Sequence, residues 1–462
     1  MQTLVVPLLP QLPELTHSNP ADVSWLVTVT LLTGAVFVPL LGRAGDMYGK
    51  RRVLLIALGS MVLGSLLCAI SSDLPVLITG RAFQGAAVAV IPLGISILRD
   101  ELPPARVIPS IAIMSSTLGV GAAFGIPAAT LVVQYANWHA MFWICLGIGL
   151  LDILVVLLVV PESKVRTSGR FDVLGALGLS AFLVCLLLAV SKGSAWGWAS
   201  PATLGLFAAA FVLIAPLWVL FELRTSAPLV DLRVSARPAV LFTNLAALLI
   251  GFAFYANSLT TAQLVQEPVS TGYGLGASIV VSGLCLLPGG VAMVLLSPVS
   301  ARISSARGPR FTLAIASVLM ATGYVVRLFT SENLAAIVAG ATVVAAGTAV
   351  AYSALPALIM HAVPVTETAA ANGLNTLMRT IGQAVCSAIV ATMLANVVAT
   401  RAGHTAPTLG AYLILFAIAG LAALAAAGLT LLIPARRPTP VRTPEPAAAG
   451  QTSEPAEAGR TP

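Results

Sequence analysis

The stretch GRAGDMYGKRR, residues 42–52, lies between two long apolar runs at 25–41 and 53–70. Two membrane helices joined by so short a link form a hairpin, and the three consecutive cations at its end predict a cytoplasmic position. The glycines of the stretch let the chain turn tightly. Asp46, a lone acid beside these cations, is expected to be ionised and paired. A generic basic loop would explain the cations but does not require the Gly-Asp-Gly spacing.

Composition places the chain in a lipid bilayer. The sequence is 58% hydrophobic and only 9% charged, with a mean hydropathy of +0.98, whereas soluble domains carry about 25% charged residues. The net charge of +7 comes largely from cations in short loops, which is a topology signal, so we expect no nucleic-acid partner. Five cysteines inside apolar runs, without metal-ligand spacing, predict no disulfide and no metal site.

Apolar runs divide the chain into about fourteen expected spans. The first is too short to cross a bilayer, because prolines interrupt it at positions 10 and 13. We therefore expect the native protein to begin upstream of Met1; no cleavable signal peptide is visible. The runs lie near 1–15, 22–43, 53–71, 74–98, 105–135, 138–160, 172–191, 200–222, 237–264, 274–300, 311–329, 333–359, 368–399 and 409–433.

The loop cations alternate between the two sides of the membrane, which predicts an even number of spans with both termini cytoplasmic. The opposite side receives only Lys192, Arg327 and Arg401. The cytoplasmic side receives the tail arginines and Arg43, Lys50, Arg51, Arg52, Arg99, Arg106, Lys164, Arg166, Arg170, Arg224, Arg233, Arg237, Arg302, Arg307 and Arg310.

An internal repeat predicts two related halves. Residues 39–51 align without gaps on 298–310, with the proline, the first arginine, the second glycine and the last arginine in common, while Ser305 replaces Asp46. Parallel repeats of this kind build transporters. We expect an all-α multi-pass membrane protein: a six-helix bundle at 1–160, a linker with two inserted helices at 161–236, a second six-helix bundle at 237–434, and a disordered tail at 435–462.

A second motif lies in the fourth expected span, where Arg81, Gln84 and Gly85 share one helix face in an apolar run. A guanidinium inside the membrane requires a polar cavity or partner. Bracing between helices is the alternative to a functional role. Either way, Arg81 is expected to be buried and essential.

These motifs resemble those of the major facilitator superfamily. The pattern G-x-x-x-D-x-x-G-[KR]-[KR] is similar to its signature loop, and R-x-x-Q-G resembles the fourth-helix motif of its proton-coupled antiporters, whose arginine is linked to proton transfer. The resemblance implies proton coupling by Arg81 and Gln84, with Gly85 in helix packing. It implies a conformational switch at Gly42, Asp46, Gly49, Lys50 and Arg51.

The fifth expected span partly resembles the antiporter motif G-x-x-x-G-P-x-x-G-G. Gly121 and Gly125 keep the spacing that lets helices approach closely, but Pro127 lies one residue late and Ala129 and Thr130 replace the two glycines. The match favours export, while plain helix packing explains the glycines equally well.

The run at 368–399 resembles the penultimate helix of the fourteen-span drug:proton antiporters. Its polar residues Asn372, Asn375 and Arg379 share one face, which must look at protein or at a cavity. With Asn257 and Gln263 from the ninth expected span, we predict a cavity lining; bracing between helices is the alternative. The antiporters' first-helix acid would fall at Met1, so Asp152, in the sixth expected span, is the alternative proton carrier.

The sequence therefore predicts a bacterial plasma-membrane transporter, not an enzyme, that exports a small organic compound in exchange for protons. The alternative is a proton symporter or facilitative importer with the same fold. We expect no cofactor, no metal and a monomer in the lipid bilayer. Residues scattered over many helices build such pockets, so the sequence does not identify the substrate.

Overall fold

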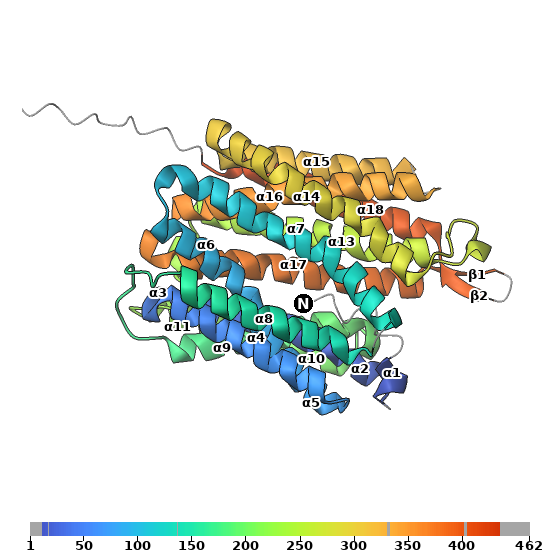
Figure 1. The fold of residues 1–462 in the computed structure, drawn as a ribbon, viewed down its shortest axis with the longest axis horizontal. Coiled ribbons are helices and arrows are strands. Elements are labelled where there is room, and N and C mark those ends of the chain that lie inside the picture. Colours follow the sequence, from blue (N-terminus) through green and yellow to red (C-terminus); the bar gives the residue numbers. More distant parts are fainter. Residues whose placement is uncertain (1–11, 17, 136, 330–332, 402–403, 435–462) are drawn as a thin grey trace, which may run out of the picture.

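Long helices that run side by side build the protein (Figure 1). The computed structural model describes residues 12–434 except 17, 136, 330–332 and 402–403. Within this part, twelve helices are long and apolar enough to cross a membrane, and α7, with 32 residues, is a further long helix. The count of fourteen spans stays a prediction, because the first expected run falls mostly outside the described residues, as does the tail.

In the first part of the chain, up to residue 224, the regular elements of the described residues are all helical. Its elements are α1 (Leu12–Leu15), α2 (Pro20–Val23), α3 (Trp25–Tyr48), α4 (Lys50–Ile70), α5 (Leu74–Gly85), the 3-10 turn η2 (Ala86–Ala89), α6 (Val90–Glu101), α7 (Pro104–Tyr135), α8 (His139–Val159), α9 (Val173–Trp196), α10 (Pro201–Ala208), the π-helical turn η3 (Ala209–Ile214) and α11 (Ala215–Arg224).

The second part adds a short antiparallel strand pair, which the sequence did not predict. Its elements are α12 (Leu232–Ser235), α13 (Pro238–Gln266), η4 (Val269–Thr271), α14 (Ile279–Arg307), α15 (Pro309–Phe329), α16 (Leu334–Ala362), η5 (Val365–Glu367), α17 (Thr368–Asn396), β1 (Val398–Arg401), β2 (His404–Pro407) and α18 (Leu409–Leu432). Helix α9 and the segment α10–η3–α11 lie where the sequence predicted two inserted helices. That they are an insertion stays a prediction, as do the predicted domain limits.

The basic hairpin is more helical than its sequence suggested. Residues 42–48 continue α3, and the chain breaks only at Gly49, whose φ of +115° favours glycine. Gly42 serves a different purpose from the expected turn: a Cβ there would lie 2.8 Å from the carbonyl oxygen of Ala369 on α17. We call the end of the molecule that carries Gly49 and the α14–α15 turn at Gly308 the hairpin end; it lies at the left of Figure 1.

Small residues let the helices approach closely, and one close contact recurs in both parts of the chain. A Cβ at Gly64 would lie 2.3 Å from the Gly80 carbonyl oxygen, and a Cβ at Gly323 would lie 3.3 Å from that of Gly340. The repeat alignment places Gly64 on Gly323 without a gap. The internal repeat is therefore visible in the packing as well as in the sequence.

Helix α17 packs against both parts of the chain. Gly373 lies against the Val38 carbonyl of α3, and Gly382 lies against the Leu248 carbonyl of α13, where a Cβ would be only 2.0 Å from the oxygen. Gly251 of α13 in turn lies against the backbone of Arg379. Contacts this close require glycine on one helix at each crossing.

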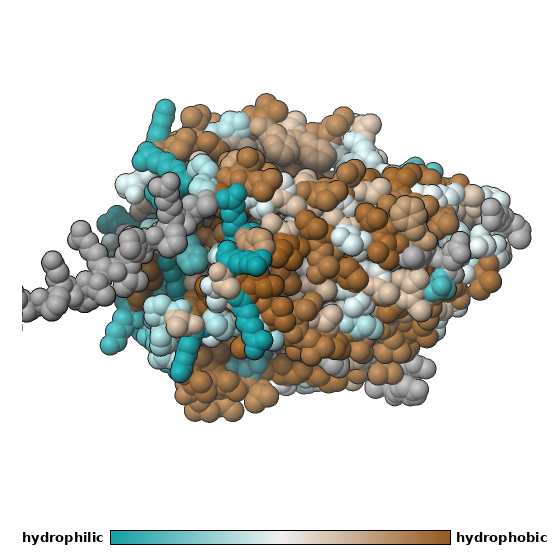
Figure 2. All heavy atoms as spheres, turned by 90° about the horizontal axis from the view of Figure 1, so that it is seen from above, coloured by the Kyte–Doolittle hydropathy of each residue, from teal (hydrophilic) through white to brown (hydrophobic). Residues whose placement is uncertain are grey.

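The outer surface is mainly apolar. Figure 2 shows long hydrophilic side chains gathered toward the hairpin end and mostly hydrophobic atoms along the rest of this face. Large apolar side chains of α8 and α10–α11 are exposed, as expected for helices that contact lipid. Lys192 and Arg327, assigned by sequence to the side opposite the hairpins, lie near that end inside α9 and α15, where both are buried.

Gly382→Ala is expected to destabilise the protein by about 1–3 kcal/mol, because its methyl group would collide with the α13 backbone. Gly59→Ala is the matched control, since a Cβ at Gly59 in α4 would meet nothing within 4 Å. Thermal unfolding of both purified variants in one detergent measures the difference. Equal melting temperatures would show that the α13–α17 crossing is not as tight as described.

Candidate functional site

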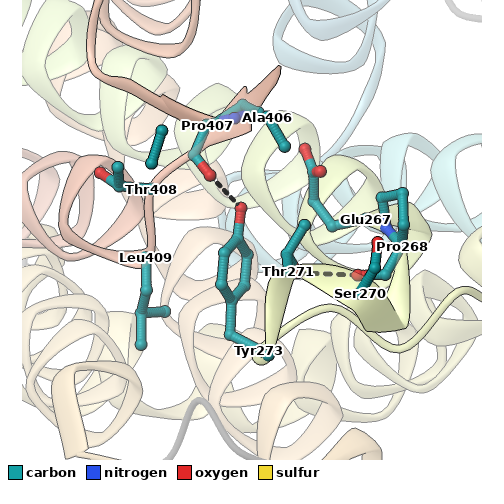
Figure 3. A pocket seen from close by; sticks show the side chains of 11 residues that line it. Glu267, Pro268, Ser270, Thr271, Tyr273, Ala406, Pro407, Thr408 and Leu409 are labelled. Carbon is teal, nitrogen blue, oxygen red and sulfur yellow. Dashed lines mark hydrogen bonds between the residues drawn. The ribbon is translucent and has the colours of Figure 1, made fainter. Parts of the chain in front are cut away.

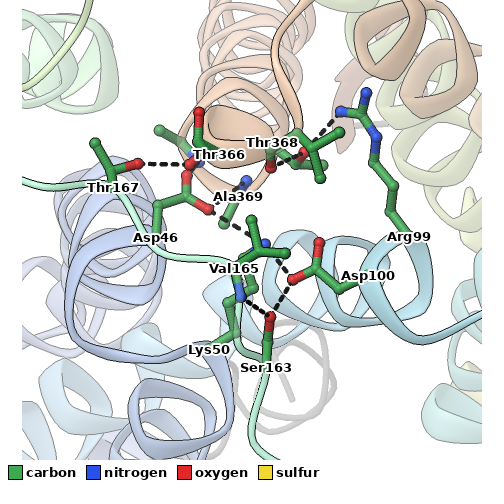
Figure 4. Close-up of polar contacts among 12 residues, drawn as sticks. Asp46, Lys50, Arg99, Asp100, Ser163, Val165, Thr167, Thr366, Thr368 and Ala369 are labelled. Carbon is green, nitrogen blue, oxygen red and sulfur yellow. Dashed lines mark hydrogen bonds and ion pairs between the residues drawn. The ribbon is translucent and has the colours of Figure 1, made fainter. Parts of the chain in front are cut away.

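Asp46 ties α3 to the start of α17 (Figure 4). Its carboxylate oxygens accept hydrogen bonds from the backbone N–H groups of Ala369 at 3.2 Å and Ala370 at 2.8 Å. The side chain is fully buried. The first N–H groups of a helix have no partner within the helix and carry a partial positive charge, so an ionised carboxylate fits this position.

Lys50 and Asp100 extend this contact into a buried charge cluster. The Lys50 ammonium lies 3.6 Å from Asp46 and 2.6 Å from Asp100 of α6. Asp100 also accepts a hydrogen bond from the Ser163 hydroxyl at 2.5 Å. One cation thus serves two carboxylates out of contact with water, an arrangement that is sensitive to the loss of any member.

Two further side chains cross between the two parts of the chain at the hairpin end (Figure 4). Arg99 of α6 donates to the Thr368 hydroxyl at 2.7 Å and to the Val363 carbonyl at 3.2 Å. The Thr167 hydroxyl donates to the Thr366 carbonyl at 2.7 Å. We call the contacts of Asp46, Lys50, Arg99, Asp100 and Thr167 the latch.

Of the predicted switch residues, Gly42, Asp46 and Lys50 meet at the latch, while Gly49 and Arg51 lie beside it. A Cβ at Gly49 would be 2.6 Å from the Glu162 carboxylate. Arg51 donates to the Leu157 carbonyl at the end of α8, at 2.6 Å. Sequence reasoning missed Arg99 and Asp100 as partners; their only signal was a charged triplet at the end of an apolar run.

Arg81 forms a second buried polar cluster within the first part of the chain. Its Nε donates to the Leu26 carbonyl at 3.2 Å and its Nη1 donates to the Gln84 side-chain oxygen at 2.7 Å. The Gln84 amide donates to the Ser65 hydroxyl at 3.0 Å. The cluster joins α3, α4 and α5, and Gly85 beside it lies against Gly34 of α3.

The polar face of α17 contains acceptors that the described residues do not use. The Asn375 amide donates to Asn244 of α13 at 2.9 Å, and the Arg379 guanidinium lies over the Tyr352 ring at 4.7 Å. The side-chain oxygens of Asn372 and Asn375 are buried without a hydrogen-bond partner in the described part of the chain. Buried polar atoms are rarely left unpaired, so these two oxygens are candidate contacts for a substrate.

Asn257 and Gln263 do not join this face. Asn257 donates to the Ala341 carbonyl at 3.1 Å and accepts from Arg327 at 2.6 Å, which braces α13, α15 and α16. The Arg327 guanidinium lies over the Phe416 ring. Gln263 is exposed. For Asn257, the contacts therefore correspond to the bracing alternative.

The remaining predicted residues lie on α7 and α8. A Cβ at Gly121 or Gly125 would meet nothing within 4 Å, so neither lies at a close helix contact here, and the Pro127 side chain is outside the described part. Asp152 is exposed on α8 among exposed apolar side chains such as Leu151 and Leu154, and no described side chain hydrogen-bonds to it.

A cavity of about 600 Å³ lies at the end opposite the hairpins, between the segment 267–273 and the start of α18 (Figure 3). The Tyr273 hydroxyl donates to the Pro407 carbonyl, and Tyr412 donates to Glu267 at 2.9 Å. Burial, and then the nearby Glu267 carboxylate, raises the pKa of Tyr273 to about 12. The phenol therefore stays protonated and remains a donor at neutral pH.

Comparisons with known proteins agree with this architecture. A family model described as Major Facilitator Superfamily matches residues 1–387. The human organic anion transporter MFSD10 (TETRAN) has a similar solved structure, with a TM-score of 0.65 at 16% identity, covering 93% of this chain and 95% of that one. At that identity, the likeness concerns the fold alone.

Two bacterial relatives carry names that refer to resistance. The tetracenomycin C resistance and export protein of Streptomyces glaucescens is 29% identical over 321 residues, which cover 69% of this chain but only 58% of that protein. The multidrug resistance protein Stp of Mycobacterium tuberculosis is 28% identical over 374 residues, or 80% of this chain and 68% of that protein. With its apolar helices and the family match over most of its length, this chain is a multi-pass membrane protein that belongs to the Major Facilitator Superfamily.

Proposed function

We propose that this protein exports small organic compounds, drugs or natural products, in exchange for protons by alternating access across the plasma membrane. The observation that carries the proposal is the latch, which joins the two parts of the chain at the hairpin end through groups that can separate. The names of the two bacterial relatives support export as the direction. The proposal includes a monomer with both termini in the cytoplasm, which makes the hairpin end the cytoplasmic end.

In this proposal, the latch is the conformational switch. Opening the hairpin end requires α17 to leave α3, and the Asp46 carboxylate then loses its two backbone donors. Hydrogen bonds to a charged group contribute about 1.5–3 kcal/mol each. Because these bonds are formed in the described conformation, the proposed orientation makes it the state in which the cytoplasmic end is closed.

The substrate and the proton are assigned to separate clusters. The unpaired oxygens of Asn372 and Asn375 lie on α17, the helix that also carries the latch, so a bound compound could influence the latch through this helix. Arg81 and Gln84 form the proposed coupling cluster, because a buried guanidinium responds to any nearby change of charge.

Transport assays test the proposed function directly. The purified protein in liposomes is given an outward or inward pH gradient, and uptake of a panel of aromatic natural products and antibiotics is measured. Expression in a bacterial host without its own drug exporters should raise resistance to at least one compound and lower its accumulation. Increased accumulation of the compounds would instead support the importer alternative. A transport rate that does not depend on the pH gradient would contradict proton coupling.

Asp46→Asn is expected to reduce transport by about tenfold or more, because the variant loses the charge that the α17 N–H groups and Lys50 stabilise. Substrate binding in detergent should survive, since Asp46 makes no hydrogen bond to the Asn372 and Asn375 oxygens and the variant leaves both side chains in place. Asp73→Asn, which changes an exposed acid at the opposite end, is the control. Normal transport by a well-expressed Asp46→Asn protein would show that Asp46 is not part of the conformational switch.

Arg81→Lys is expected to insert normally but to lose proton-driven transport. A guanidinium can donate to Leu26 and Gln84 at once, while an ammonium has a different geometry. Counterflow exchange without a gradient, compared with transport under a pH gradient, separates loss of coupling from loss of folding. A lysine variant that stays fully coupled would reduce Arg81 to a generic positive charge; Arg170→Lys at an exposed site is the control.

Asp152 is kept as a separate hypothesis for the proton-carrying carboxylate, because it lies well inside α8. If Asp152 carries the proton, Asp152→Asn abolishes the response to pH while exchange continues. Its exposed position among apolar side chains leads us to expect an unchanged pH profile instead. Loss of the pH response in the Asp152→Asn variant would contradict that expectation and would assign proton coupling to α8.

A further inference from the structure

A basic cavity of about 770 Å³ lies at the hairpin end of the second part of the chain. It opens between the start of α13, the α14–α15 turn, and the ends of α16 and α18. Its cationic lining consists of Arg237, Arg307 and Arg310, with His361 beside them, and its apolar lining includes Phe311, Leu358 and Leu431.

The cations of this cavity lack the carboxylates that balance the corresponding hairpin of the first part. All three ion pairs of the described residues belong to Lys50 and Arg52, with Asp46, Asp100 and Glu162 as acids. In the repeat, Ser305 stands at the position of Asp46. No Asp or Glu lines the cavity in the described part of the chain, so its positive charge is not compensated by its own walls.

Two of the three arginines are free to bind an additional group. Arg310 donates to the carbonyls of Thr430 and Leu431 at 2.8 and 2.9 Å, which fixes it to the end of α18. Arg307 stacks over the Phe311 ring at 5.1 Å. Within the described residues, the guanidinium groups of Arg237 and Arg307 make no hydrogen bond or ion pair, and both residues are exposed at the cavity.

The cavity also continues into the apolar surface that faces the bilayer. Leu431 is 72% exposed and Phe311 is 38% exposed. Guanidinium groups pair well with phosphate oxygens, and basic pockets between helices at a membrane boundary attract anionic headgroups. A free phosphate ion would use the arginines but would leave the adjoining apolar walls uncovered.

We propose that this cavity binds the phosphate headgroup of an anionic membrane phospholipid, with the acyl chains lying along Phe311 and Leu431. Arg237 and Arg307 hold the phosphate, and Arg310 lines the site while it holds the end of α18. The lipid thereby joins α13, α14 and α15 at the hairpin end, where the second part of the chain lacks acids of its own.

Lipid titration of the purified full-length protein in a neutral detergent tests the site. Dioleoylphosphatidylglycerol, dioleoylphosphatidylcholine and inorganic phosphate are added separately, and bound lipid is counted by native mass spectrometry alongside the melting temperature. The wild type should retain phosphatidylglycerol and gain thermal stability from it, with little response to phosphatidylcholine. The double variant Arg237→Gln/Arg307→Gln should bind phosphatidylglycerol at least about tenfold more weakly, because two charged donors are lost.

The control is the double variant Arg166→Gln/Arg170→Gln, which removes the same charge from exposed positions outside the cavity. It should bind phosphatidylglycerol like the wild type. Equal weakening in both double variants would show attraction to the overall charge and overturn the proposal. Saturation of the stability gain by inorganic phosphate alone would overturn the assignment to a lipid. Unfolded protein is recognised by its melting curve, and Arg307→Lys then tests the same position with the charge kept.

Discussion

The structure depends on a backbone-to-backbone approach of α3 and α17 that leaves space only for glycine. Gly42 and Gly373 remove the side chains at this crossing, and the Asp46 carboxylate can then reach the first N–H groups of α17. Because the carboxylate is buried, it needs a counter-charge nearby, and Lys50 supplies it. Lys50 in turn brings Asp100 and the loop that follows α8 into the cluster. Each member is placed by the one before it, so a single helix crossing organises this charge cluster.

The two parts of the chain share their packing but differ in how they use charge. Gly64 and Gly323 occupy equivalent positions and make equivalent contacts, yet the buried guanidinium comes from different helices: Arg81 lies on α5, and Arg327 lies on α15. In the repeat alignment, Arg327 falls at the position of Cys68, beside the same glycine crossing. Arg81 and Arg327, which do not align in the repeat, therefore both stabilise helix contacts beside the equivalent glycine crossings. The hairpins differ more strongly, because only the first contains acids that neutralise its cations.

Hydropathy predicted the helices well, because each long apolar run between basic loops has one low-energy solution in lipid. The charge pattern also predicted a paired Asp46 beside the hairpin cations, of which Lys50 is a partner, but it did not predict the other partners. Two of the partners are backbone N–H groups of α17, and these have no signature in the sequence because every residue carries one. For Asn257, the sequence shows a polar side chain in an apolar run, which requires a polar partner or a cavity, but it does not show which one. The fold shows that the partners are Arg327 and the α16 backbone. Gly121 and Gly125 have the spacing of a helix contact without a close neighbour in this conformation.

The position of Lys50 limits what opening the latch would require. Lys50 lies four residues after Asp46, on the other side of the Gly49 turn, so the pair moves as one unit when α17 departs. The carboxylate would lose two backbone hydrogen bonds but keep its ammonium partner, and Asp100 would keep its own bond to Lys50. An isolated buried carboxylate would be far more unfavourable. A switch between two states needs a difference of only a few kcal/mol. A charge cluster that stays whole on one side has that property when opening breaks only its bonds to the α17 N–H groups and the neutral acceptor bonds of Arg99 and Thr167.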